Sequence, residues 1–87
     1  MYLENDTKFY EISWIKGAIY IHFGKIPDMD ARLPFGTVKK YSFEDKNKRK
    51  SFYNNKINEK LKKGYEVIKD GVGASSDMKE MIKLKKL

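Results

Sequence analysis

The sequence predicts an α+β fold: a small twisted antiparallel sheet of about four strands, with one main helix packed across it and a short C-terminal helix. Two observations predict it. Apolar and polar side chains alternate along two runs within residues 8–23, as in paired strands. The charged segment 45–63 places apolar residues four apart, as on one side of a helix. The chain has 87 residues, of which 40% are hydrophobic, and this length suits a single core.

The first two strands are expected to form a hairpin. The strand Lys8–Trp14 should be half-buried, and the turn Ile15–Ala18 joins it to a second strand that ends at Gly24. Gly24 lacks a Cβ and therefore permits close approach of another backbone segment. The more apolar faces of the two strands carry Tyr10, Ile12, Trp14, Ile19, Ile21 and Phe23. The opposite faces carry Phe9, Glu11, Ser13, Tyr20 and His22.

Two further strands are predicted. After a loop at Pro27–Asp30, a third strand should run over about Arg32–Tyr41, interrupted by Pro34 and Gly36. A short fourth strand is expected at Tyr65–Ile68, where alternation returns after a glycine.

The main helix should lie between the third and fourth strands. Asp45 is the expected N-cap, because its carboxylate can accept hydrogen bonds from the first free amides, and the helix should continue to Lys63. Tyr53, Ile57 and Leu61 recur every four residues and are expected to form its buried stripe.

The sequence divides into three segments. Residues 1–69 are expected to form the domain, residues 70–76 a flexible joint rich in small side chains, and residues 77–87 an amphipathic helix capped by Ser76 or Asp77. Its apolar side carries Met78, Met81 and Ile82, and Leu84 could extend it. Because so short a helix is marginal in water, it should dock on the domain; dimerisation and fraying are the alternatives.

Several classes of function lack support. The chain has no cysteine and one histidine, and it contains neither a phosphate-binding glycine motif nor a signature of nucleophilic catalysis, so we expect no cofactor, no metal site and no enzyme activity. It has neither a signal-peptide pattern nor eighteen consecutive apolar residues, so we expect no membrane partner and a cytoplasmic or nucleoid-associated location.

The basic residues are concentrated in one third of the chain. Residues 37–63 contain ten basic and three acidic residues, so this segment accounts for the formal net charge of +7. A localised positive charge speeds encounter with a polyanion, which can be a nucleic acid or an acidic protein surface. Solubility is the alternative explanation of the charge.

The order of these features resembles a WGR domain. Over about residues 8–68, the aromatic-glycine-cation triplet Phe23-Gly24-Lys25, then Phe43 before the helix, then Lys62-Lys63-Gly64-Tyr65 at its end occur in family order. The family is named for a Trp-Gly-Arg triplet. Its members occur in DNA-damage-responsive poly(ADP-ribose) polymerases and in bacterial regulators. The resemblance therefore implies a non-catalytic module that contacts nucleic acid.

The triplet supplies the first candidate site residues. In WGR domains that bind DNA breaks, the tryptophan packs against the terminal nucleotide, so the resemblance implies a stacking role for Phe23. A core position is the alternative, because Phe23 shares a face with apolar residues of its strand. Gly24 is expected to set the backbone geometry, and Lys25 to pair with phosphate as a point charge.

Other basic residues extend the candidate site. One edge of the helix carries Arg49, Lys56, Lys60 and Lys63, which could follow a phosphate backbone or form an ordinary solvated face. Lys39 and Lys40 could extend this surface from the sheet. His22, on the polar side of its strand, either donates a hydrogen bond to phosphate or is a plain surface histidine.

Two functional hypotheses follow. The first is a module that binds DNA, including DNA ends, or RNA. The second is a small regulator or inhibitor, encoded by a mobile element for example, that docks on the acidic surface of a nucleic-acid enzyme. We expect a monomer, or a weak homodimer formed through residues 77–87.

Overall fold

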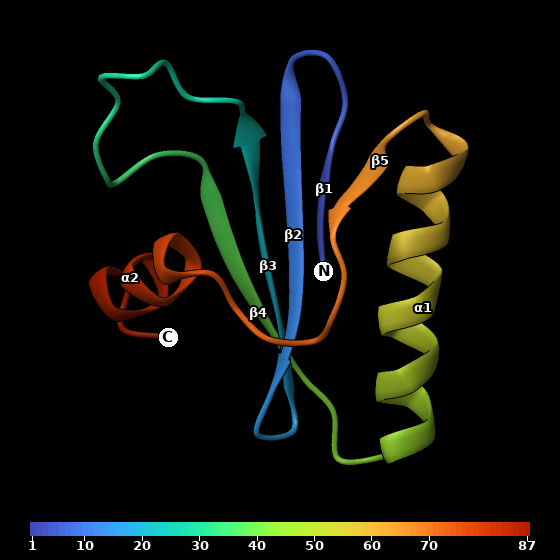
Figure 1. Ribbon diagram of the computed structural model, residues 1–87. Helices are drawn as coiled ribbons and strands as arrows, with labels where there is room; N and C mark the ends of the chain where they lie inside the picture. Colours follow the sequence, from blue (N-terminus) through green and yellow to red (C-terminus); the bar gives the residue numbers. More distant parts are fainter.

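A computed structural model describes all 87 residues as one antiparallel sheet flanked by two helices (Figure 1). In chain order, the elements are β1 (Tyr2–Glu4), β2 (Lys8–Ile15), β3 (Ala18–Lys25), β4 (Thr37–Ser42), α1 (Lys46–Lys62), β5 (Glu66–Lys69) and α2 (Ser76–Leu84). The fold class is thus the α+β class predicted, with a single main helix and a short C-terminal one.

The five strands are arranged in the order β4-β3-β2-β1-β5. The central hairpin is antiparallel, as predicted. Its register places Lys8 opposite Lys25 at the open end and Ile15 opposite Ala18 at the turn. Lys16 and Gly17 both have positive φ, as a tight two-residue hairpin turn requires.

The first strand was not predicted. β1 is only three residues long, which is too short for alternation to be visible, yet it lies between β2 and β5 and is paired with both. The third strand also begins later than expected, at Thr37, so that residues 26–36 form a longer loop. β5 lies one residue beyond the expected strand.

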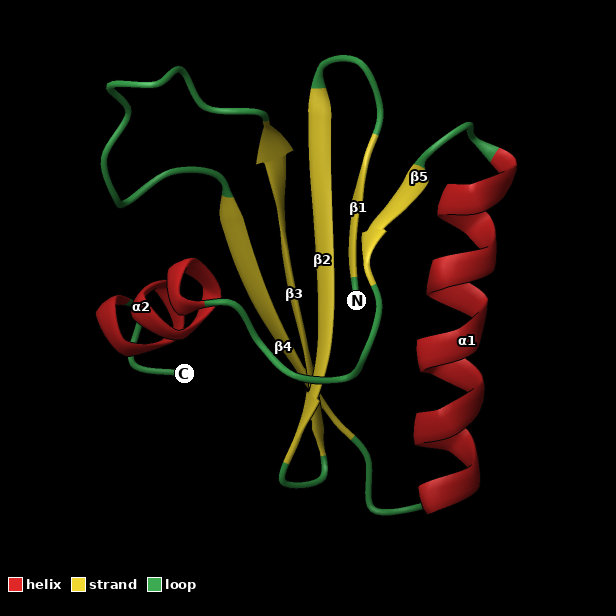
Figure 2. Ribbon diagram, viewed as in Figure 1, coloured by secondary structure: helices red, strands yellow, loops and turns green.

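The two helices lie on opposite faces of the sheet (Figure 2). On the α1 face, Tyr53 and Ile57 of the helix pack on buried residues of β1, β2 and β3; the cluster consists of Leu3, Tyr10, Ile12, Ile19, Ile21, Tyr53 and Ile57. On the other face, Met78 of α2 packs on Ala18 and Tyr20. The sheet therefore has a core on each side.

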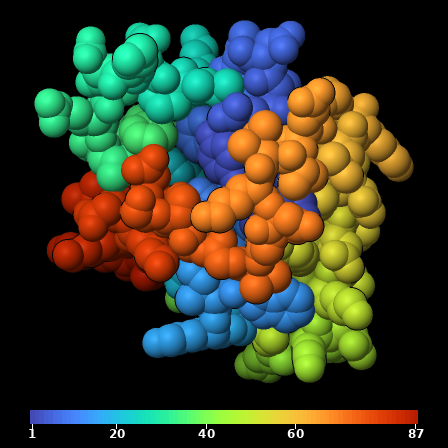
Figure 3. All heavy atoms as spheres, in the orientation of Figure 1, coloured from blue at the N-terminus to red at the C-terminus, as the bar shows by residue number.

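The prediction that β2 is buried on one face only is wrong. Five consecutive residues, Phe9 to Ser13, are buried, because α2 and the loop before β4 cover the second face. Figure 3 shows the C-terminal residues, coloured orange to red, spread over the middle of the molecule. His22 is consequently not a surface residue: it is 1% exposed, with Nε2 2.9 Å from the carbonyl oxygen of Phe35.

The main helix begins as predicted but buries fewer residues. The side chain of Asp45 caps it by accepting from the amides of Asn47 (2.8 Å) and Lys48 (3.3 Å). Leu61, however, is 43% exposed, so the prediction of a buried Leu61 is wrong. Residues four apart in a helix drift by about 40° per step, and by Leu61 the stripe has turned away from the sheet.

The C-terminal helix docks on the domain, as expected. Met78 and Met81 are completely buried. Its N-cap is Ser75, so the prediction of Ser76 or Asp77 as the cap is wrong by one or two residues. The segment before it follows the sheet closely: the carbonyls of Val72 and Gly73 accept hydrogen bonds from the Trp14 amide and the Ser13 hydroxyl.

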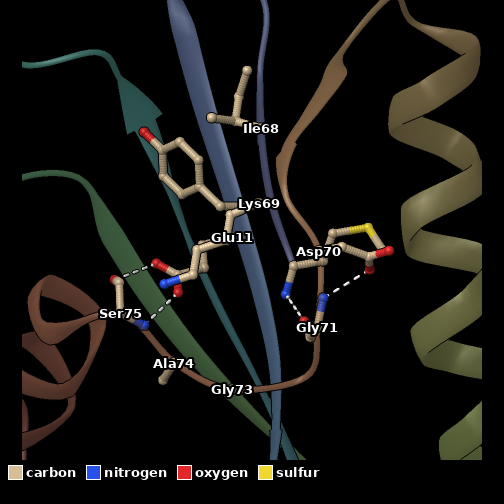
Figure 4. A pocket seen from close by; sticks show the side chains of 10 residues that line it. Glu11, Ile68, Lys69, Asp70, Gly71, Gly73, Ala74 and Ser75 are labelled. Atoms are coloured by element: carbon tan, nitrogen blue, oxygen red, sulfur yellow. Dashed lines mark hydrogen bonds between the residues drawn. The ribbon is translucent and has the colours of Figure 1, made fainter.

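Ser75 joins α2 to the sheet through a buried carboxylate. Its hydroxyl and amide donate to the two oxygens of Glu11, at 2.6 and 2.7 Å (Figure 4). Its Oγ also accepts from the amide of Met78 at 3.1 Å. Glu11 is 3% exposed, and these bonds compensate for its removal from water. Ser75 therefore caps α2 and also supplies the hydrogen bonds that the buried Glu11 carboxylate of β2 needs.

Removing that hydroxyl should destabilise the protein. Ser75→Ala loses the cap and one bond to a buried carboxylate, and we expect the free energy of unfolding to fall by about 2 kcal/mol. Urea unfolding measures the change. Ser76→Ala is the control, because Ser76 is exposed and forms neither bond. An equal, small effect of the two substitutions would contradict this description.

Candidate nucleic-acid interface

Two adjoining grooves run between α1 and the open end of the hairpin. The first, of about 270 Å³, is lined by Tyr10, Ile21, Phe23, Lys39, Tyr41, Lys56, Glu59, Lys60 and Lys63. The second, of about 350 Å³, is lined by Lys8, Phe9, Tyr10, Phe23, Gly24, Lys25, Lys60 and Tyr65. Because Tyr10, Phe23 and Lys60 line both, we treat the two as one surface and call it the basic groove.

Six lysines from four elements surround the basic groove. They are Lys8 of β2, Lys25 of β3, Lys39 of β4, and Lys56, Lys60 and Lys63 at or beyond α1. The hairpin register places Lys8 directly beside Lys25, and helical periodicity brings the last three onto one edge of the helix. Glu59 is the only acidic residue in the lining, and its carboxylate lies 3.8 Å from the Lys56 ammonium.

Aromatic rings form the floor of the basic groove. Tyr10 lies between Phe23 and Tyr65, with ring centroids 6.5 Å from each. The ammonium of Lys60 lies 4.7 Å from the Tyr10 centroid and 5.3 Å from that of Tyr65, and Lys39 lies 5.9 Å from the Phe23 ring. Lysines placed over rings keep their charge close to an apolar surface, where it is only partly hydrated.

The charge of Lys60 is held in an unfavourable position. Partial burial, and then the neighbouring charge of Lys63, lower the pKa of Lys60 below its ordinary value, while Glu59 opposes the shift. The protonated form is thus less favoured in the folded protein than in the unfolded chain, and an anion placed in the groove would stabilise it.

The lowered pKa of Lys60 predicts that removal of its charge stabilises the folded protein. Lys60→Met keeps a long apolar stem over the two tyrosines but removes the charge, so stability at neutral pH should rise slightly. Between the lowered pKa and the ordinary value of 10.5, the unfolded chain binds more protons, so the gain should disappear as the pH approaches 10.5. Thermal unfolding at several pH values measures it; a loss of stability would contradict the pKa assignment.

The triplet lies at the junction of the two grooves. Phe23 is half-buried: it packs against the core on the α1 side and also lines both grooves. It therefore combines the two alternatives, a core position and a ring accessible for stacking. Gly24 makes the close backbone approach expected of it, since a Cβ there would lie 2.9 Å from the Cα of Gly36. Lys25 is exposed at the end of β3.

Three of the candidate residues lie elsewhere. His22 is buried on the α2 side, and Lys40 lies on that side too, 5.8 Å from the Tyr20 ring. Arg49 lies 5.7 Å from the Trp14 ring and donates to the carbonyl oxygen of Phe43, and it lines neither groove. Its contacts tie the first turn of α1 to the sheet.

Sequence reasoning missed seven residues that line the basic groove: Lys8, Phe9, Tyr10, Ile21, Tyr41, Glu59 and Tyr65. A signal for Lys8 was present, because counting back from the Lys16-Gly17 turn pairs it with Lys25. For the tyrosines the sequence contains no such signal, because alternation alone does not show which end of a strand the helix leaves uncovered.

The fold is that of a small α+β domain with a lysine-lined groove. The chain matches the family model of the WGR domain over residues 2–72 and belongs to that family. WGR domains are non-catalytic modules that bind nucleic acids. The helix α2 lies beyond the matched residues.

No curated protein and no solved structure gives a significant match to the chain. Neither helix combines the length and the apolar character that crossing a membrane requires.

Proposed function

We propose that this protein binds nucleic acid without catalysis, through the basic groove. The observation that carries the proposal is the convergence of six lysines from three strands and one helix on a single aromatic floor, with one acidic residue among them. A positively charged groove over rings suits a polymer that is anionic along its backbone and aromatic in its bases.

The residues divide into two roles. The lysines pair with phosphates and release counterions, which makes the affinity depend on salt. Phe23, which is half-buried at the junction of the grooves, offers its exposed part for stacking on a base or sugar. Such stacking contributes about 1–3 kcal/mol per base. Gly24 supports the ring by allowing the backbone behind it to close on Gly36.

A salt titration tests this proposal. We expect log K for a short duplex to fall linearly with log salt, with a slope of about −4.5 to −5.5 if five or six lysines each neutralise one phosphate. The same lysines should give a shallower slope with a single strand. Lys79→Ala/Lys83→Ala is the control, because it removes two exposed α2 charges outside the basic groove and should leave the slope unchanged.

Absence of binding to any nucleic acid at low salt would overturn the proposal. In that case, an acidic protein partner would become the stronger candidate for the basic groove, since its carboxylates can replace the phosphates.

A further inference from the structure

The outer side of α1, away from the sheet and the basic groove, carries a row of three side-chain amides and one hydroxyl. Asn47, Ser51, Asn54 and Asn58 are all exposed, as is Asn55 beside them. In Figure 1 the helix stands at the edge of the molecule with only one side toward the sheet. The side chains that form hydrogen bonds at this helix are Asp45, its cap, and Arg49, so the donors and acceptors of the row face solvent.

These amides reduce the stability of the helix that carries them. Asparagine has a lower helix propensity than alanine, glutamine or lysine, because its short side chain competes for backbone hydrogen bonds. Ion pairs do not compensate, since the single one along α1 is Lys56–Glu59 on the groove side. The row therefore adds nothing to the stability of the fold, and its donors and acceptors are free to pair with a ligand.

The row has the geometry of a base-reading surface. At 100° per residue, its four members fall within a band of about 60°, and they extend about 16 Å along the helix. Their spacing of i, i+4, i+7 and i+11 resembles the way recognition helices present side chains to base edges. Lysines flank the row on both sides: Lys50 on one, and Lys48 and Lys62 on the other.

We infer that the outer side of α1 enters the major groove of B-form DNA and reads adenines. A helix of about 10–12 Å diameter fits a major groove about 12 Å wide, and asparagine pairs with adenine through N6 and N7. The flanking lysines then face the two phosphate strands. RNA is a poor fit, because the major groove of an A-form duplex is too narrow to be read. The inference rests on the nucleic-acid binding proposed above and adds a second surface to it.

The test uses Asn54→Ala/Asn58→Ala with two duplexes of one A·T-rich sequence, natural or with 7-deazaadenine. The modified base lacks the N7 acceptor but leaves the backbone unchanged. We expect the variant to unfold at a higher temperature than the wild type and to bind the natural duplex about 10-fold or more weakly. The wild type should lose a similar factor on the modified duplex, whereas the variant should not distinguish the two.

Two results separate this inference from the proposed function. If the variant binds the natural duplex as well as the wild type does, or if 7-deazaadenine has no effect on the wild type, base reading by α1 is wrong and binding through the basic groove stands. If the wild type binds RNA but no DNA, the inference fails and the proposed function stands; if it binds neither, both fail. The stability measurement excludes misfolding as the cause of a lost affinity.

Discussion

A variant that loses three lysines of the basic groove, Lys25→Ala/Lys39→Ala/Lys60→Ala, should bind a short duplex roughly 100-fold or more weakly at about 0.1 M salt. The three side chains come from β3, β4 and α1, so the substitution removes charge from three of the four elements that surround the groove. Each lost phosphate contact should also reduce the salt slope by about 0.9. Fluorescence anisotropy at several salt concentrations measures both quantities.

The control for this variant has the same change in net charge. Lys79→Ala/Lys83→Ala/Lys86→Ala removes three exposed lysines at or beyond α2, outside the basic groove. We expect less than about a threefold change in affinity, because only long-range, screened attraction is reduced. Equal losses in the two triple variants would mean that net charge alone governs binding and that the groove has no specific role.

The second large effect is expected at Gly36. Its φ is +70°, and a Cβ there would lie 2.6 Å from the carbonyl oxygen of Phe23 and 3.0 Å from the ring of Phe9. Gly36→Ala therefore combines left-handed strain with a collision against backbone, and it should lower the free energy of unfolding by about 3 kcal/mol or more. Urea unfolding provides the measurement.

Gly73→Ala provides the matched comparison for Gly36→Ala. A Cβ at Gly73 meets nothing within 4 Å, so the substitution should be close to neutral. Because Gly36 touches both Gly24 and the Phe23 carbonyl, its replacement should also disturb the triplet. A Gly36→Ala protein as stable as the wild type would contradict the close packing of these two glycines.

Local patterns were sufficient for the parts of the fold that have local causes. Alternation identified the hairpin, the Asp45 cap identified the start of α1, and the missing Cβ of Gly24 indicated a close approach. The triplet and the order of the elements around it identified the family. In each case the property belongs to a few neighbouring residues.

The remaining features depend on contacts between distant segments. The burial of His22 follows from the position of α2 and of the loop that contains Phe35, neither of which alternation within β3 can show. Lys39 and Lys40 were considered together, but a strand sends neighbouring side chains to opposite faces, so only Lys39 reaches the basic groove. Helical drift turned Leu61 outward and left Lys60 over the tyrosines.

An NMR titration with a short oligonucleotide tests the central claim, that the basic groove is the nucleic-acid interface, most directly. The backbone amide chemical shifts should change at Lys8, in the triplet, at Lys39 and along the last turns of α1. The chemical shifts of the α2 amides should not change. Shifts confined to α2 and the face that it covers, or no shifts at an oligonucleotide concentration that saturates binding, would contradict the account.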